Sequence, residues 1–176
     1  MTKNSSTATP PAAAVAKDAH WAAKRDKLRS RVRPTATMTI CDDQAARQAL
    51  DSARQDVLRA QISGDAPKTA TAEAALADAQ AAFDDAAIVL TFQALRRTDF
   101  EDLKAEHPPT ETQAEEGQIV NVETFGPALI SACSLDGLTV EDATSFLTEW
   151  SAGEAAQLFN TSWDLQEAIR ADLGKG

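Results

Sequence analysis

The sequence of 176 residues has no tyrosine and only two cysteines and two histidines. Cys41 and Cys133 do not form a C-x-x-C pair, and His20 and His107 are too widely spaced to complete a metal-ligand cluster. The glycine-rich dinucleotide motif, the phosphate-binding loop, the H-E-x-x-H motif and the G-x-S-x-G motif are also absent. We therefore expect a non-enzymatic protein without catalytic, cofactor-binding or metal-binding residues, whose two cysteines are buried and reduced.

Long apolar runs are missing as well. No stretch approaches the ~20 apolar residues of a membrane-spanning helix, so we expect no membrane partner. Alanine supplies much of the 43% hydrophobic content and aromatic residues only 5%, which favours closely packed helices over a thick aromatic core. The first 34 residues have the composition of an organellar transit peptide but no secretory apolar segment, and we expect a cytoplasmic protein.

Positive charge is scarce outside the first 33 residues. Residues 1–33 hold eight Lys/Arg and two Asp, a net charge of +6, whereas residues 34–176 hold nine Lys/Arg and 25 Asp/Glu, a net charge of −16. Nucleic-acid binding needs clustered basic residues, so the charge of the whole chain argues against a nucleic-acid partner. The basic arm could still contact an acidic neighbour, or it could be a solvated tail that folds back on its own body.

The chain divides into three predicted regions of an α+β, mostly α, protein. Residues 1–33 form a basic N-terminal arm, in which residues 1–16 are expected to be disordered and residues 17–31 to form a short helix. Residues 34–97 form a strand–helical hairpin–strand unit, and residues 98–176 form a C-terminal bundle of short helices.

Residues 34–97 carry the most regular pattern. Residues 35–41 and 88–95 are predicted strands, and Asp42 or Asp43 can cap the helix that follows the first strand. Residues 63–67 break the helical region into two arms of about 20 residues, each about 30 Å long. Equal arms bring the two strands together as a two-stranded antiparallel ribbon, from which an antiparallel helical hairpin projects. The helical stripes that form its seam are Ala46, Leu50, Ala53, Val57 and Ala60, and Ala72, Leu76, Ala79, Phe83 and Ala86.

The C-terminal region reads as a series of capped helices. Five of the six phenylalanines and two of the three tryptophans lie at or beyond Phe92, so the main core is expected here. Residues 110–118 are expected to form a loop. The predicted inward residues are Phe125, Leu129, Ala132, Cys133, Phe146, Leu147, Trp150, Leu158, Phe159, Trp163 and Ile169. The predicted caps are Thr98 with Glu101, Thr124, Thr139 with Asp142, and Ser151 with Glu154.

Three other sets of candidate metal-binding or catalytic residues have simpler structural explanations. The pairs Asp42–Asp43 and Asp84–Asp85 could be metal ligands, but they fall at helix ends or on a charged face. His107 precedes two prolines and is expected to end a helix instead of acting as a general base. Cys133 has no histidine near it in sequence, so we place it in the core and not as a nucleophile.

Several short sequence motifs between Phe92 and Gln166 resemble those of a known family. They are Leu103–Pro109 (LKAEHPP), Thr124–Ile130 (TFGPALI), Thr139–Asp142 (TVED), and Trp150–Glu154 (WSAGE) followed by Leu158-Phe159. In order and content they resemble the tail assembly chaperones of long-tailed, siphovirus-type bacteriophages that infect actinobacteria. Gly126 stands where that family has a second proline, and the basic arm has no counterpart there.

The resemblance implies a protein that binds the tape measure protein, assists tail tube assembly and helps to recruit the major tail protein. It implies action in the cytoplasm of the infected bacterium, absence from the mature virion, and a longer frameshifted product in many members. The implied partner-binding patch draws on six apolar residues, for each of which core packing is the alternative: Phe125, Leu129, Phe146, Trp150, Phe159 and Trp163.

Two other functions stay open at this point. One is a structural virion protein, such as a minor tail or head–tail joining protein, and the other is a cytosolic coiled-coil adaptor. The alanine-rich seam of the hairpin could simply join its own two helices, or it could leave a surface for another subunit of a homo-oligomer.

Overall fold

A computed structural model describes residues 12–169, with side chains from His20 onward, and the chain divides into two compact units, residues 1–33 and 34–176. The first unit contains one helix, α1 (Ala12–Arg29). The helix predicted over residues 17–31 is therefore present, but the disorder expected for residues 12–16 is wrong, because α1 already begins at Ala12. The alanines of this segment favour a helix. Residues 1–11 lie outside the described residues.

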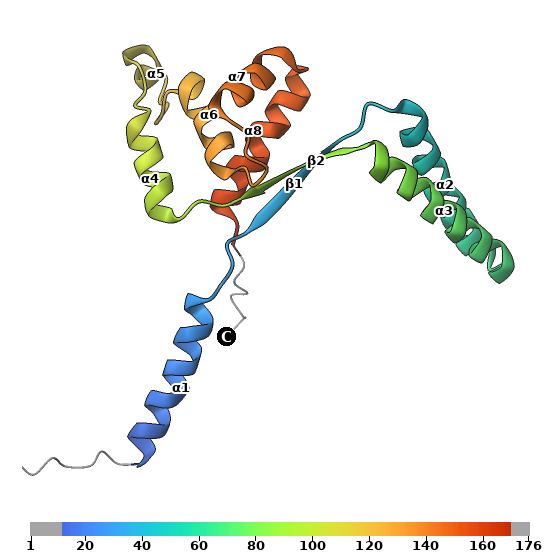
Figure 1. The fold of residues 1–176 in the computed structure, drawn as a ribbon, viewed down its shortest axis with the longest axis horizontal. Coiled ribbons are helices and arrows are strands. Elements are labelled where there is room, and N and C mark those ends of the chain that lie inside the picture. Colours follow the sequence, from blue (N-terminus) through green and yellow to red (C-terminus); the bar gives the residue numbers. More distant parts are fainter. Residues whose placement is uncertain (1–11, 170–176) are drawn as a thin grey trace, which may run out of the picture. The chain divides into compact units, whose positions relative to one another are not determined.

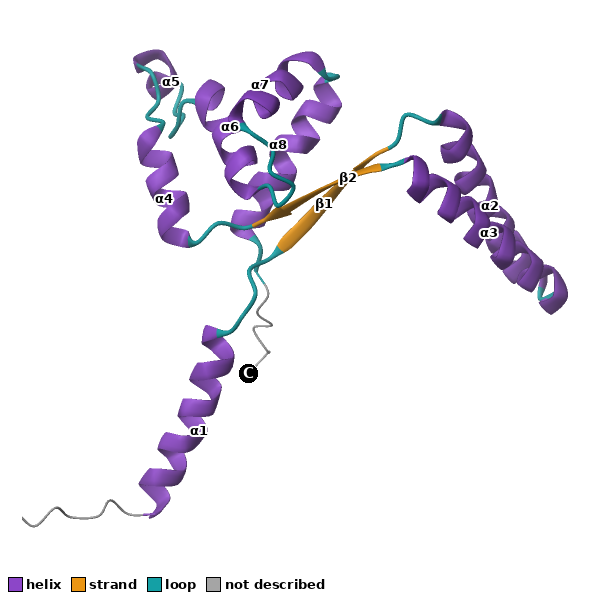
Figure 2. Ribbon diagram, in the orientation of Figure 1, coloured by secondary structure: helices purple, strands orange, loops and turns teal. Residues whose placement is uncertain are grey.

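The second unit confirms the predicted fold class, α+β and mostly α (Figures 1 and 2). Its two strands, β1 (Thr35–Ile40) and β2 (Ile88–Gln93), form an antiparallel ribbon. The register runs from the pair Thr35–Gln93 to the pair Ile40–Ile88. Side chains alternate across a strand, so Ala36, Met38 and Ile40 face the core side while the threonines of β1 are exposed.

Between the strands, α2 (Gln44–Ser63) and α3 (Ala66–Ala86) form the predicted hairpin. Asp43, and not Asp42, is the cap of α2: its Oδ1 accepts hydrogen bonds from the N–H groups of Ala45 and Ala46 at 2.8 and 3.0 Å. Gly64 ends α2 with φ of +68°, a left-handed conformation that glycine adopts without steric cost.

The seam of the hairpin is only lightly buried. Ala46, Leu50 and Ala53 of α2 are buried near its base, whereas α3 has no fully buried residue. Ala86, the last residue of α3, was expected in the seam and is exposed.

The C-terminal bundle consists of α4 (Arg97–Glu106), α5 (Glu111–Glu115), α6 (Val122–Cys133), α7 (Val140–Glu149) and α8 (Ala152–Glu167). Its core continues into the ribbon, since Met38 and Phe92 belong to the same buried cluster as the helical residues Phe125, Leu129 and Leu158. The bundle therefore covers the apolar face of the ribbon, which a two-stranded sheet needs for stability.

Two of the predicted caps of the bundle are confirmed as full capping boxes. Thr139 and Asp142 begin α7, and Ser151 and Glu154 begin α8. His107 ends α4, as expected from the two prolines that follow it.

Other predictions for the bundle are wrong. The helix α4 begins at Arg97 without a side-chain cap, so Thr98 is not its cap. Asn121 caps α6 in place of Thr124. Residues 110–118 are not a loop throughout, because a capping box at Thr110 begins the short helix α5.

Two expected core residues lie at the surface. Ala132 is on the exposed side of α6, and Ile169 lies beyond the end of α8 with 83% of its surface exposed. Among the described residues, none of the helices is long and apolar enough to span a lipid bilayer.

Candidate partner-binding groove

The six predicted partner-binding residues fall into three places. Phe125 and Leu129 of α6 are completely buried at the centre of the core, so they present no surface to a partner in this structure. The other four are half-buried and form two pairs, Phe146 with Trp150 and Phe159 with Trp163.

The pair Phe146–Trp150 stacks at the C-terminal end of α7. Residues four apart lie on one face of a helix, and the ring centroids are 4.6 Å apart with an interplanar angle of 13°. The backbone holds this arrangement, because Trp150 donates its N–H to the carbonyl oxygen of Phe146 at 3.1 Å. The result is a flat aromatic surface of two rings.

This aromatic surface faces apolar residues of the ribbon across a groove. The lining residues from the ribbon are Ile40, Ile88 and Leu90, and the volume is about 370 Å³. Ile40 and Ile88 are directly opposite each other in the two strands, so their side chains lie side by side. Ile88 is 62% exposed, which is a large fraction for an isoleucine. We call this site the ribbon groove.

Carboxylates line part of the ribbon groove. Asp42 follows β1 and Glu154 lies in the first turn of α8, and both side chains are exposed. Glu154 also accepts a hydrogen bond from the hydroxyl of Ser151 at 2.6 Å, which holds the carboxylate at this position. An apolar groove with acidic groups at its rim suits an apolar partner segment that also carries Lys or Arg.

A second groove, of about 260 Å³, follows the end of β1 and shares Ile40, Asp42 and Glu154 with the ribbon groove. Its other lining residues come from β1 and the segment after it, from α8 and from the hairpin: Met38, Thr39, Cys41, Gln157, Arg47 and Phe83. We call it the edge groove. The two grooves together form a continuous surface around the end of the ribbon that is nearest the hairpin.

The pair Phe159–Trp163 lines a separate apolar pocket on α8, of about 340 Å³, with the exposed side chains Ile119 and Val122. The ring of Trp163 is anchored to the core, because it packs edge-on against the buried Phe125 at 6.1 Å between ring centroids. This pocket is also apolar, but the part that Trp163 contributes is anchored in the core.

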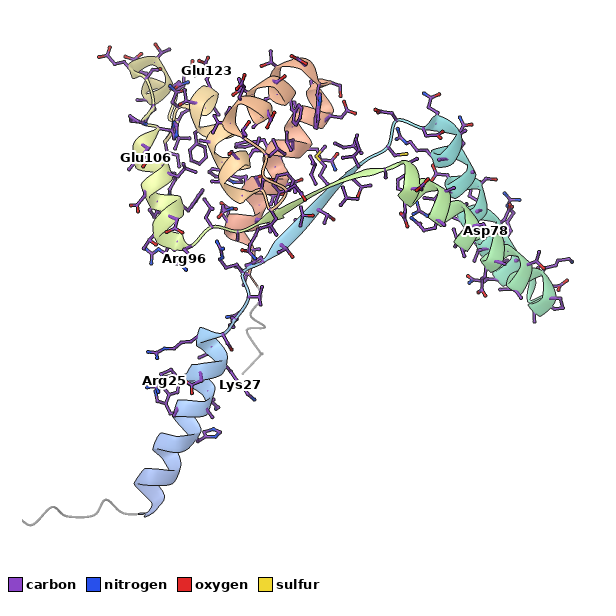
Figure 3. The ribbon with its side chains drawn as sticks, viewed as in Figure 1. Arg25, Lys27, Asp78, Arg96, Glu106 and Glu123 are labelled. Atoms are coloured by element: carbon purple, nitrogen blue, oxygen red, sulfur yellow. The ribbon has the colours of Figure 1, made fainter. Side chains whose placement is uncertain are left out.

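The surface of the bundle is strongly acidic. Between Lys104 and Arg170 the sequence has twelve Asp/Glu and no Lys or Arg. Among the described residues of the bundle, Lys104 forms the one ion pair, with Glu101 at 2.8 Å. Glu106 of α4 and Glu123 of α6 belong to this acidic set (Figure 3). This charge disfavours nucleic acid and favours a partner that is neutral or basic.

The candidate metal ligands and catalytic residues of the sequence analysis either have structural roles or are exposed on the surface. Asp43 is a helix cap, the described residues contain no group of His, Cys, Asp and Glu that could hold a metal ion, and Cys41 and Cys133 are buried free thiols. Hydrogen bonds of Thr139 to the carboxylate lower the pKa of Asp142, which completes the capping box at the start of α7.

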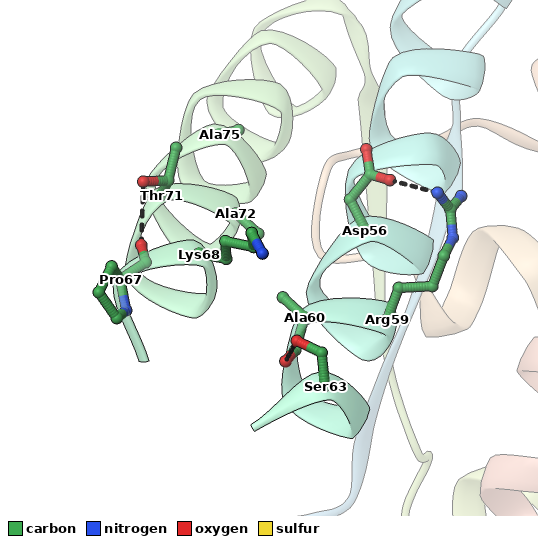
Figure 4. Close-up of a pocket in the computed structure, with 9 residues that line it drawn as sticks. All are labelled: Asp56, Arg59, Ala60, Ser63, Pro67, Lys68, Thr71, Ala72 and Ala75. Atoms are coloured by element: carbon green, nitrogen blue, oxygen red, sulfur yellow. Dashed lines mark hydrogen bonds and ion pairs between the residues drawn. The ribbon is translucent and has the colours of Figure 1, made fainter. Parts of the chain in front are cut away.

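The hairpin also has an open hollow, between α2 and α3 near their connecting turn (Figure 4). Its charged side chains pair locally, as Asp56 does with Arg59 at 3.0 Å. The hydroxyl groups of Ser63 and Thr71 donate to the backbone of their own helices. We see no arrangement of nucleophile and base among its lining residues.

Sequence reasoning missed the ribbon residues of the groove, Ile40, Ile88 and Leu90. The strand pattern places them on the apolar face but does not show where the covering helices end. One signal was available for the aromatic pairs: the pattern F-x-T-x-W occurs twice, at residues 146–150 and 159–163. An aromatic pair four residues apart on two consecutive helices predicts two aromatic surfaces.

Comparison of the chain with protein-family models, with curated proteins and with solved structures found no match. The features of this chain that bear on function are the grooves, the charge distribution and the sequence motifs that resemble a phage family.

Proposed function

We propose that this protein is a tail assembly chaperone of a long-tailed bacteriophage, and that it binds apolar helical stripes of the tape measure protein in the ribbon groove. The observation that carries this proposal is the groove itself: the stacked rings of Phe146 and Trp150 face the exposed Ile88 across a cleft of about 370 Å³.

The chemistry of the ribbon groove supports a helical occupant. An amphipathic helix buries its apolar side chains in a groove with an apolar floor and a polar rim. The carboxylates of Asp42 and Glu154 at this groove suit Lys or Arg next to the apolar stripe of the occupant. A long tape measure protein exposes such stripes before assembly, and covering them prevents its aggregation.

The charge of the second unit supports the same role. Residues 34–176 carry a net charge of −16. Many copies bound along one long apolar chain would surround it with negative charge, and like-charged complexes stay soluble because they repel one another. In this proposal the protein acts in the cytoplasm of the infected cell, helps to recruit the major tail protein and leaves before the virion matures.

Co-expression with the candidate tape measure protein tests the proposal. We expect the long partner to become soluble and to elute with many copies of this chain in size-exclusion chromatography. If the partner stays insoluble and nothing co-elutes, the chaperone function is wrong. Finding this chain in purified virions would instead favour a structural virion protein.

A pair of neighbouring substitutions tests the groove. Ile88→Thr removes apolar surface from the ribbon groove and keeps a β-branched residue in the strand. Val89→Thr is the matched control, because Val89 is 49% exposed and points to the opposite face of the ribbon. We expect Ile88→Thr to weaken co-elution about tenfold and Val89→Thr to have little effect. Equal effects of the two substitutions would show that the partner does not bind in this groove.

A further inference from the structure

We infer that the outer edge of β1 is an acceptor for an extended segment of another protein, which binds as a third strand of the ribbon. This site is distinct from the apolar floor of the ribbon groove, because it consists of backbone N–H and C=O groups. It does not depend on the tail-chaperone function, and it would be tested in the same way if the protein had another role.

The pairing of the ribbon shows which backbone groups are free. The N–H of Ala94 donates to the carbonyl oxygen of Pro34 at 2.9 Å, and these two residues are the next pair in the register after Thr35–Gln93. Hydrogen-bonded pairs alternate with non-bonded pairs in an antiparallel ladder. Ala36, Met38 and Ile40 are therefore in bonded pairs, and the N–H and C=O groups of the threonines between them point away from β2.

These outward groups have no partner within the described part of the chain. No donor or acceptor there pairs with the backbone of Thr37 or Thr39 on the side away from β2. The threonine side chains of β1 are exposed as well, so solvent and a peptide can both reach the edge.

The opposite edge of the ribbon is closed at its centre. Thr91 of β2 donates its N–H to the carboxylate of Asp136 and accepts a hydrogen bond from the N–H of Leu135 at 2.8 Å. Phe92 forms an isolated bridge with Ser134 in the same segment. The loop between α6 and α7 thus occupies the edge of β2, and β1 keeps the accessible edge of the sheet.

The edge of β1 also lacks the features that usually prevent strand addition. Proteins protect an exposed edge with Lys, Pro, a β-bulge or a very short strand. The six residues Thr35–Ile40 contain no charged residue, no proline and no glycine, and their pairing with β2 is continuous. A regular strand of this length and composition binds an extended peptide through its backbone.

The occupant is a segment of a different protein and not a second copy of this chain. A second copy would bring another unit of residues 34–176, with a net charge of −16, to an edge that the carboxylate of Glu154 already lines. Two such units repel each other, whereas a basic segment of another protein is attracted to this edge.

The edge groove indicates which side chains the incoming strand carries. Glu154 and Gln157 of α8 line this groove together with Met38 and Thr39. Its charged groups are the carboxylates of Asp42 and Glu154 and the single guanidinium of Arg47, which leaves an excess of negative charge. Side chains of the added strand that point toward α8 would meet the carboxylate of Glu154, so they should include Lys or Arg. Those on the other face would lie beside the exposed threonines of β1, where β-branched residues pair well. The expected ligand is an extended, basic segment rich in β-branched residues.

The test uses a synthetic peptide of about seven residues that alternates valine with lysine or threonine, a length that covers the strand. Its binding to the full chain is followed residue by residue through the amide signals in NMR spectra. We expect the amide protons of Thr37 and Thr39 to shift and to exchange more slowly with solvent, while those of Ala36 and Met38, which already bond to β2, change much less. A shift that does not alternate along β1, or that is confined to Ile88 and Leu90, would overturn the inference.

Two protein variants separate backbone pairing from other contacts. Thr37→Pro removes the outward N–H without removing a hydrogen bond to β2, and proline is tolerated at such an edge position. Thr37→Val keeps the N–H and the strand propensity. We expect Thr37→Pro to weaken peptide binding about tenfold and Thr37→Val to leave it unchanged. Equal binding by all three proteins would refute strand addition.

The peptide itself supplies a test that does not depend on the folding of a variant. Methylation of the backbone nitrogens that face β1 should abolish binding, and methylation of the nitrogens that face away should not. Equal effects of the two peptides would refute the inference. A wild-type protein that is dimeric, with a dimer that Thr37→Pro dissociates, would show that a second copy covers the edge, and the assignment to another protein would be wrong.

Discussion

The hairpin formed by α2 and α3 should be removable at a single point of the ribbon. Ile40 and Ile88 are the last pair of the register, and they belong to the hydrogen-bonded set. A bonded pair at the end of an antiparallel ribbon can be closed by a two-residue type I′ turn such as Asn-Gly. Replacing residues 41–87 by Asn-Gly would therefore convert the ribbon into a simple β-hairpin and keep its register.

The structure allows the effect on stability to be worked out. The main buried cluster, which includes Met38, Phe92 and Leu158, has no member between residues 41 and 87, so its packing should not change. Shortening the connection from about 50 residues to two lowers the entropy cost of closing the ribbon by up to roughly 3 kcal/mol. The gain reaches this limit only if the hairpin is unfolded when the ribbon forms. We expect the free energy of unfolding to stay the same or to rise.

Urea denaturation monitored by tryptophan fluorescence is the assay. Trp150 and Trp163 lie in the bundle and report on its unfolding, and Trp21 can be replaced by phenylalanine in both proteins so that α1 does not contribute. The denaturant slope should fall, because the shortened chain exposes less surface on unfolding. A loss of more than about 2 kcal/mol, a typical effect of damage to a core, would show that the hairpin is an integral part of the fold and would refute this reasoning.

Three further results are expected. Leu158→Ala should lower the free energy of unfolding by about 2–5 kcal/mol because the side chain is completely buried, whereas Leu135→Ala, at an exposed position, should cost less than about 0.5 kcal/mol in the same urea titration. Hydrogen bonds from Thr139 lower the pKa of Asp142 below 3.8, so its stabilising effect is present above that pH and is lost as the pH falls through the lowered pKa. Thermal melts should therefore show Asp142→Ala less stable than wild type at neutral pH, with a difference that shrinks in acid, and a constant difference would contradict this assignment. Cys133 should resist a thiol reagent in the native protein and react quickly in urea, since a buried thiol must be exposed before the reagent can reach it.

The parts of the fold that follow from local signals were predictable from the sequence. The hairpin has a cap at Asp43, a glycine at its turn and two matching apolar stripes, and each of these signals involves only residues that are close in sequence. The helices α7 and α8 begin at reciprocal capping boxes, which involve only two residues three positions apart. The ribbon followed from the equal length of the hairpin arms.

The two wrongly predicted caps depend on hydrogen bonds that the local sequence pattern does not reveal. Asn121 is held at the start of α6 because its N–H donates to the carbonyl oxygen of His107 at 2.8 Å. Its side-chain oxygen then accepts a hydrogen bond from the N–H of Glu123 and so caps the helix. The sequence near Thr124 contains no sign of this contact, since His107 lies far upstream. The hydroxyl group of Thr98 donates a hydrogen bond to the carboxylate of the neighbouring Asp99. The N-cap position of α4 is occupied by Arg96, whose side chain forms no capping hydrogen bond.

The candidate site was predictable in kind but not in detail. Phe125 and Phe146 have the same side chain and both lie on helices, yet Phe125 is completely buried because α4 covers it through Phe100, at 6.2 Å between ring centroids. Phe146 is only half-buried because it lines the open ribbon groove. Burial of this kind depends on which elements meet in space, and a stripe on one helix does not contain that information.

The charge of the bundle determines which experiments can reach it. With no Lys or Arg between Lys104 and Arg170, trypsin releases the whole segment from Ala105 to Arg170 as one peptide, whether the protein is folded or not. Amine-reactive cross-linkers have no target on α6, α7 or α8, and Lys104 of α4 is the one lysine among the described residues of the bundle. Such reagents would therefore report mainly contacts of the basic arm, the hairpin and α4. Mapping a partner on this face therefore calls for carboxylate-directed cross-linking and for a protease that cleaves at glutamate.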